Sequence, residues 1–284
     1  MKLSKIFALL LALCLISSAA CAATFTDAHG NVIELDDSLE AYAAVTLVGA
    51  DNAARQGETN LGDLWADALR WFAASGEINA AFDEDDVKAG NDRITVDADH
   101  VVALWNGGNL RADIAEGTFG TEALAEVLPF PNKVAVVYMT GAQLLETLEA
   151  ASQGLPYTAE TADACASLMQ VSGLTYTVDT TKAYDALEAY GDHWFTAGSI
   201  SRVRIDDVNG QPFDAEATYA VVTSNANFNG MDSSYVLKAA AEANEQSAVT
   251  TAVVRDVVFR FIASELNHQV GEAYAAPQGR LTIL

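Results

Sequence analysis

The segment that most constrains the fold of this chain is an apolar run that ends in a loop with two glycines. The run is Val101-Val102-Ala103-Leu104, and the loop continues as Trp105-Asn106-Gly107-Gly108-Asn109-Leu110-Arg111. A short apolar run bounded by such a loop is typical of a buried strand. Glycine permits positive φ angles and a close approach of other atoms to the backbone. The loop therefore fits either an ordinary turn at a strand end or a place where a ligand meets the backbone.

The first 22 residues have the composition of a secretory leader. Two lysines precede an apolar stretch from Ile6 to Ile16, and Ala20-Cys21-Ala22 offers small residues for cleavage. No later segment reaches the ~20 apolar residues that a membrane-spanning helix needs. We therefore expect an exported protein, periplasmic or extracellular, without a membrane span. Lipidation at Cys21 is the alternative, although Ser18 stands where lipoboxes usually have leucine.

The cysteine content and the net charge argue against several classes of protein, among them disulfide-stabilised domains and proteins that bind nucleic acids or anionic membranes. Outside the leader, Cys165 is the single cysteine, so no disulfide within the chain stabilises it. A lone thiol without a recognisable histidine partner is typical of a small core residue. The formal net charge is −24, and such a field repels nucleic acids and anionic membrane surfaces. A single nucleotide remains compatible with this charge where arginines gather locally.

The pattern of apolar residues predicts an α+β domain with a mixed sheet over residues 49–284. Residues 23–48 are expected to form an appendage, a hairpin with its turn at residues 27–31. The expected strands of the domain are residues 101–105, 133–139, 169–178, 201–205, 219–223 and 280–284. The expected helices are residues 60–75, 121–127, 141–151, 234–244 and 250–267.

The common catalytic signatures are absent from the sequence. It has no Gly-x-Ser-x-Gly elbow, no phosphate-binding glycine-rich loop that ends in Lys-Ser/Thr, and no His-Glu-x-x-His. Asp27 and His29 have the spacing of a metal-binding pair, but the further ligands of a two-metal hydrolase do not follow. The acidic run at residues 83–86 lacks the spacing and central glycine of a calcium loop. We expect no metal or other cofactor in this chain.

Seven segments of the sequence, taken together and in their order, show a resemblance that no single segment shows alone. They are Arg55–Ala68, Asn106–Arg111, Glu126–Phe130, Thr140–Leu144, Gln170–Tyr176, Tyr219–Thr223, and Val254–Asp256 with Gln278–Leu281. In this order they resemble the C-terminal domain of the 5'-nucleotidase family, whose loop signature is Asn-Gly-Gly-x-Ile-Arg. In that family an N-terminal metallophosphatase domain cleaves the phosphate, and the C-terminal domain holds the nucleoside.

The resemblance implies a domain that recognises a substrate. Only about 30 residues separate the leader from the match, too few for a metallophosphatase domain. We therefore expect a stand-alone binding domain, working with a separate metallophosphatase that would hold the divalent metals. Its ligand would be a small nucleotide or nucleoside.

The resemblance also implies a set of binding residues. They are Arg55, Asn106, Gly108, Arg111, Phe130 and Asp232, and Phe228 is added as a candidate on its position in the sequence. The arginines and Asn106 would give polar and charge-assisted contacts to the nucleotide. Phe130 would stack on the base, and Asp232 would accept hydrogen bonds from ribose hydroxyls. Gly108 belongs to the loop in which backbone would approach the ligand.

Residues 225–235 depart from the family pattern Asn-Phe-Leu-Ala-x-Gly-Gly-Asp-Gly-Tyr/Phe. The phenylalanine that forms the second wall of the family's base site falls on Ala226 here. Phe228 lies two residues later and is the candidate to replace it. Met231 and Ser233 stand where the family has glycines.

Three hypotheses follow. The first is an exported nucleotide- or nucleoside-binding domain that does not hydrolyse its ligand alone. The second is a structural or interaction domain that kept the fold and lost the site. The third is an active phosphoester hydrolase, against which the missing metal ligands argue.

Overall fold

The structure, a computed structural model, describes residues 22–26, 30–36, 39–82, 94, 96–186 and 197–284. Several sequence-based expectations fall outside these residues. They are the leader up to residue 21, the pair Asp27 and His29, and the acidic run at residues 83–86. Within the described residues, no helix is both long enough and apolar enough to cross a membrane.

A five-stranded mixed sheet forms the centre of the main body, in the order β13-β6-β12-β4-β7. These strands are β4 (Val101–Asn106), β6 (Lys133–Thr140), β7 (Met169–Ser172), β12 (Thr218–Ser224) and β13 (Ala248–Val253). Strands β4 and β12 run parallel, and the other neighbouring pairs are antiparallel. The expected α+β architecture with a mixed sheet is confirmed.

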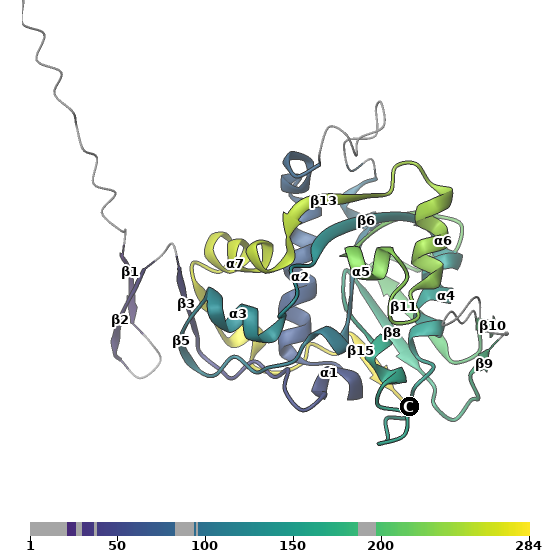
Figure 1. The fold of residues 1–284 in the computed structure, drawn as a ribbon, viewed down its shortest axis with the longest axis horizontal. Coiled ribbons are helices and arrows are strands. Elements are labelled where there is room, and N and C mark those ends of the chain that lie inside the picture. Colours follow the sequence, from purple (N-terminus) through teal and green to yellow (C-terminus); the bar gives the residue numbers. More distant parts are fainter. Residues whose placement is uncertain (1–21, 27–29, 37–38, 83–93, 95, 187–196) are drawn as a thin grey trace, which may run out of the picture.

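Both faces of this sheet are buried, which explains why β4 reads as a continuous apolar run. Successive side chains of a strand point to opposite faces. In β4, Val101, Ala103 and Trp105 belong to one apolar core, and Val102 and Leu104 belong to the other. The first core lies under helices α2 (Asn60–Ala74) and α7 (Val254–Ser264), and the second under α4 (Gly141–Ala151) and α6 (Tyr235–Ala243). Figure 1 shows these two helix pairs on either side of the molecule.

Smaller sheets complete the body. Strands β11 (Val203–Val208), β8 (Leu174–Val178) and β15 (Leu281–Ile283) form one, and β14 (Gln269–Val270), β3 (Glu40–Ala43) and β5 (Gly117–Gly120) form another. The remaining pairs are β1 (Ala22–Thr26) with β2 (Val32–Asp36), and β9 (Asp185–Ala186) with β10 (Ala197–Ser199). The β1–β2 hairpin projects from the body (Figure 1), whereas residues 40–48, which the sequence grouped with it, join the body through β3.

The other helices are short. They are α1 (Ala53–Gln56), α3 (Thr121–Val127) and α5 (Asn225–Phe228), with 3-10 turns η1 (Glu77–Ala80), η2 (Ala98–His100), η3 (Gly107–Asn109), η4 (Ala164–Ser167) and η5 (Glu272–Tyr274). The sequence-based helix at 250–267 was wrong at its start. Residues 248–253 form β13 and the helix begins at Val254, because β-branched residues favour a strand there. The expected strand at 169–178 divides into β7 and β8 at Gly173, whose φ is +81°.

Candidate functional site

Three loops meet at one edge of the central sheet. Because β4 and β12 are parallel neighbours, their carboxyl ends lie at the same edge, the usual location of ligand sites in open sheets with parallel strands. Strand β6 is antiparallel to β12 and begins there, with Val134 opposite Ser224. The loops that follow β4 and β12 and the loop that precedes β6 are therefore neighbours.

A hollow of about 460 Å³ lies among these loops. It is lined by Asn109, Arg111, Phe130, Pro131, Asn132, Asn225, Ala226, Asn229, Met231 and Asp232. The guanidinium carbon of Arg111 lies 4.8 Å from the centre of the Phe130 ring, a cation–π contact. This contact covers one face of the ring, and Phe130 as a residue is nevertheless 44% exposed. The hollow therefore offers a flat apolar surface beside a positive charge.

A second hollow, of about 240 Å³, adjoins the first at Arg111. It is lined by Asp51, Asn52, Arg55, Gly108, Leu110 and Arg111. Arg55 lies on α1, and its Nη1 donates to the carbonyl of Ala162 at 2.9 Å. Two guanidinium groups thus face one small space, an arrangement that suits an anion such as phosphate.

Helix α1 is held in place by Gln170 of β7, whose side chain is buried. Its Nε2 donates to the carbonyls of Ala54 at 3.0 Å and Gly57 at 2.9 Å, and its Oε1 accepts from the Thr59 amide at 3.0 Å. All three hydrogen-bonding groups of the amide side chain are used. Gln170 therefore positions the helix that carries Arg55.

Asp232 lines the larger hollow and is held by a buried amide beneath it. The Nδ2 of Asn106 donates to its Oδ2 at 2.7 Å, and Asn109 donates to the Oδ1 of Asn106 at 2.8 Å. Partial burial raises the pKa of Asp232, while the positive charges of Arg55 and Arg111 oppose that shift. The carboxylate is fixed from below, with acceptor capacity left for a ligand.

The backbone beside this carboxylate is unusual. Asp232 has φ +50° and Ser233 has φ +61°, so two successive non-glycine residues adopt the left-handed conformation. This is the segment in which Ser233 replaces a glycine of the family pattern. Strain of this kind persists only where surrounding contacts hold it, and it is common at functional sites.

The two glycines of the loop after β4 make room for the chain itself. A Cβ on Gly107 would lie 2.0 Å from the carbonyl oxygen of Ala54, and one on Gly108 would lie 2.7 Å from the Cβ of Ala166. Gly107 thereby lets α1, and with it Arg55, pack against the loop. Both glycines therefore have a packing role within the chain. Gly108 also lines the smaller hollow, so contact of its backbone with a ligand stays a prediction.

Comparison with known proteins identifies this architecture. The sequence model of the 5'-nucleotidase C-terminal domain matches residues 40–239. The chain belongs to this family. The 5'-nucleotidase precursor from Thermus thermophilus is 30% identical, with a TM-score of 0.62 over 86% of this chain and 39% of that one.

Two further relatives agree. The trifunctional nucleotide phosphoesterase protein of Bacillus subtilis is 28% identical over 188 residues, which is 65% of this chain and 10% of that protein. The NAD nucleotidase of Haemophilus influenzae has the same fold, with 14% identity and a TM-score of 0.56 over 92% of this chain and 48% of that one. The chain thus spans less than half the length of each relative.

Of the residues that resemblance to the 5'-nucleotidase C-terminal domain implied, four side chains meet at the two hollows. They are Arg55, Arg111, Phe130 and Asp232. Asn106 lies beneath them instead. It is fully buried, and its amide is engaged by Asp232, Asn109 and the carbonyl of Ala166. Asn106 is therefore a positioning residue.

Phe228 does not take the place of the missing aromatic wall. It packs against the core under α4 and α6, and it is absent from the residues that line the hollow. The residue that does line it at this point is Ala226. The two stand two positions apart on the single turn of α5, so their side chains point in different directions.

Besides Asn109, three asparagines that line the larger hollow were not among the residues predicted from the sequence. Asn225 accepts from the Lys133 amide at 3.0 Å and so ties α5 to the start of β6. Asn132 is buried, and its Oδ1 has no hydrogen-bond partner. Asn229 lines the rim. Asn132 directly precedes β6 and Asn225 directly follows β12, and this position at the ends of buried strands is the signal that could have indicated them.

Among the described residues, no group of three or more His, Cys, Asp and Glu side chains is arranged to hold a metal ion. His100 contacts Tyr219 with ring centres 5.4 Å apart, and the Nδ1 of His268 lies 3.0 Å from the carbonyl of Glu40. Both histidines are thus used in packing or backbone contacts.

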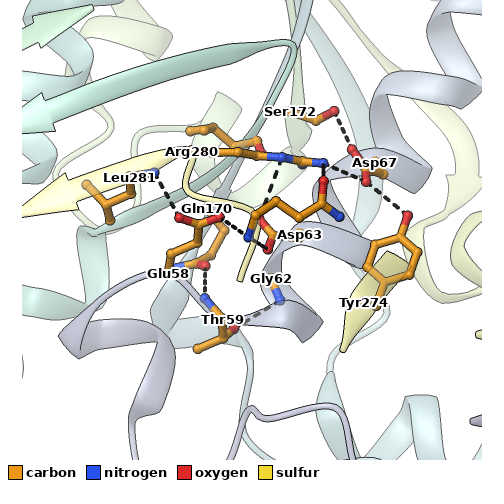
Figure 2. Close-up of polar contacts among 12 residues, drawn as sticks. Glu58, Thr59, Gly62, Asp63, Asp67, Gln170, Ser172, Tyr274, Arg280 and Leu281 are labelled. Atoms are coloured by element: carbon orange, nitrogen blue, oxygen red, sulfur yellow. Dashed lines mark hydrogen bonds and ion pairs between the residues drawn. The ribbon is translucent and has the colours of Figure 1, made fainter. Parts of the chain in front are cut away.

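A second polar cluster joins the first and last of the seven segments (Figure 2). Asp67 of α2 accepts from Arg280 at 2.8 Å, from Tyr274 at 2.9 Å and from Ser172 at 2.6 Å. Glu58 accepts from the Leu281 amide at 2.9 Å. These hydrogen bonds connect β15 and the residue before it to α2 and the residues before it. Glu58 and Asp67 therefore have a structural role.

Asp63 lies in the middle of this cluster and is fully buried. Burial, together with the adjacent Glu58 carboxylate, raises its pKa to about 8, and the attraction of Arg280 only partly opposes this. Its Oδ2 accepts from the Gln278 amide at 3.1 Å. At neutral pH the carboxyl is therefore mostly protonated, and its proton can be shared with Glu58.

Proposed function

We propose that this domain binds a nucleoside or nucleotide at the two adjoining hollows. The anionic end would lie between Arg55 and Arg111, the base against Phe130, and the ribose diol at Asp232. The observation that carries the proposal is the convergence of these side chains from α1 and three separate loops. Each matches the chemistry of one part of a nucleotide: guanidinium for phosphate, an aromatic ring for a base, and a carboxylate for a diol.

The family supports the substrate class. The relatives named above are a 5'-nucleotidase, a nucleotide phosphoesterase and an NAD nucleotidase. By this proposal, the domain binds the nucleotide, and this is the role in nucleotide breakdown that it shares with these relatives. We propose further that the protein is exported by its leader and works beside a metallophosphatase.

Recognition without hydrolysis is part of the proposal. In the described part of the chain, the residues that line the two hollows include no serine, cysteine or histidine. Arginine, asparagine and a carboxylate bind and orient a phosphate ester. Its cleavage at a useful rate, in this proposal, needs the metal-activated water of a partner.

Titration calorimetry with adenosine, AMP and ribose 5-phosphate tests this function. We expect AMP to bind, and Phe130→Ala to weaken its binding by about tenfold or more, since stacking on one aromatic ring is worth about 1–3 kcal/mol. Phe228→Ala is the matched control and should leave affinity unchanged once stability is accounted for. No binding by any nucleoside or nucleotide at millimolar concentration would refute the proposal.

The same protein should be assayed for phosphate release from AMP with Mn²⁺, Zn²⁺ or Co²⁺ added. We expect no release above the buffer rate. Release that copurifies with the protein, and that Asp232→Asn abolishes, would show that the hydrolase hypothesis is correct.

A further inference from the structure

Two large apolar side chains are exposed at the same hollow. Phe130 is 44% exposed and Met231 is 59% exposed, and both line the larger hollow. Large exposed apolar side chains gathered at one concave site mark a surface that a ligand covers. Arg111 lies over one face of Phe130, and the 44% exposure of the residue still leaves apolar surface for a flat ligand.

Met231 is held at the rim by its backbone. Its amide donates to the carbonyl of Ala226 at 3.0 Å, and its carbonyl accepts from the Ser234 amide at 3.1 Å. It stands between Gly230, with φ +90°, and Asp232, which the buried Asn106 fixes. The backbone at residue 231 is therefore well defined, while the unbranched side chain is free to adapt its shape.

We propose that Met231 is the second wall of the base site, so that a base lies between the exposed surface of Phe130 and the Met231 thioether. The inference rests on the proposed function. A thioether is polarisable and packs favourably on flat aromatic rings. The small side chain of Ala226, which lines the same hollow, leaves the room that Met231 needs to reach over the ligand.

Paired ligands separate this inference from the proposed function. For Met231→Ala we expect AMP to bind about tenfold more weakly, while ribose 5-phosphate, which has no base, binds as before. Met231→Leu should restore most of the affinity for AMP. Leu39→Ala is the matched control, because Leu39 is 55% exposed and lines neither hollow.

An unchanged affinity of Met231→Ala for AMP would overturn the inference and leave the proposed function standing. An equal loss for AMP and ribose 5-phosphate would also overturn it, because the effect would then not act through the base. If the unaltered protein binds no nucleotide, the proposed function and this inference both fail.

Methionine oxidation gives a readout that needs no substitution. Dilute peroxide should oxidise Met231 readily, whereas Met139 and Met169, which are 2% and 1% exposed, serve as internal controls. Peptide mass spectrometry should show that AMP protects Met231 and that ribose 5-phosphate does not. Full oxidation of Met231 while calorimetry shows AMP bound would contradict the inference.

Discussion

Asn106 shows how a buried amide can serve a binding site from below. Its side chain has no exposed surface, and it links Asn109 to Asp232 through hydrogen bonds of 2.8 and 2.7 Å. A carboxylate at the rim of a hollow has many rotamers available, and the bond from Asn106 selects one of them. Asn106 therefore contributes to ligand binding by orienting the carboxylate of Asp232.

Replacing Asn106 should affect ligands that carry a ribose diol and spare those that lack it. For Asn106→Ala we expect about tenfold weaker binding of adenosine, in line with the ~1–3 kcal/mol of a buried hydrogen-bonded group. Binding of 2',3'-dideoxyadenosine should change little. Calorimetry with both ligands makes the comparison, and Asp232→Asn should show the same selectivity. Equal losses for the two ligands would indicate that Asn106 has only a structural role.

At the level of elements, the position of α1 decides where Arg55 lies. This one-turn helix packs against the loop after β4, where only a residue without a Cβ fits at position 107. Gly107→Ala should push α1 outward, because its Cβ would lie 2.0 Å from the carbonyl oxygen of Ala54. We expect calorimetry to show AMP bound several-fold more weakly, while adenosine, without phosphate, is little affected.

Gly57→Ala provides the control for this prediction. Gly57 directly follows α1, its backbone is extended, and nothing lies within 4 Å of a Cβ at that position. The two variants therefore make the same chemical change next to α1, one in the loop on which the helix packs and the other just after its last residue. If Gly57→Ala reduces AMP affinity as much as Gly107→Ala does, the packing of α1 on the loop is not what places Arg55.

Helices and strands with a regular spacing of apolar residues could be predicted from the sequence. Short strands that depend on pairing with distant segments could not. The helices at 121–127 and 141–151 match their predicted bounds, because their apolar spacing and the Thr140 cap with Gln143 are local. Strands β3 and β5 were missed, since four-residue strands take their identity from pairing with distant segments.

The candidate site likewise contains residues that could be predicted from the sequence and residues that could not. Arg111, Phe130 and Asp232 were predicted from the resemblance to the 5'-nucleotidase C-terminal domain, and the structure places all three at the larger hollow. The burial of Asn106 and the inward direction of Phe228 could not be predicted, because both depend on which of two faces a side chain takes in the folded chain. The exposure of Met231 likewise becomes visible only when the loops are assembled.

At the scale of the whole molecule, the cluster around Asp63 connects α2, near the N-terminal end of the domain, to β15 at its C-terminal end. A buried carboxyl with a raised pKa gives this connection a pH dependence. The folded protein keeps the Asp63 proton up to a pH of about 8, whereas the unfolded chain loses it near the ordinary aspartate pKa of 3.8. Between these values the folded state binds more protons than the unfolded state.

The free energy of unfolding should therefore fall as the pH rises from about 4 to about 8, since stability decreases with pH wherever the folded state holds the extra proton. Each unit of raised pKa corresponds to ~1.4 kcal/mol. Asp63→Asn keeps an uncharged side chain of the same shape and should flatten this slope. Urea unfolding at several pH values measures it, with the exposed Glu242→Gln as control. A slope that Asp63→Asn leaves unchanged would mean that Asp63 is ionised in the folded protein, and that Arg280 outweighs both burial and Glu58.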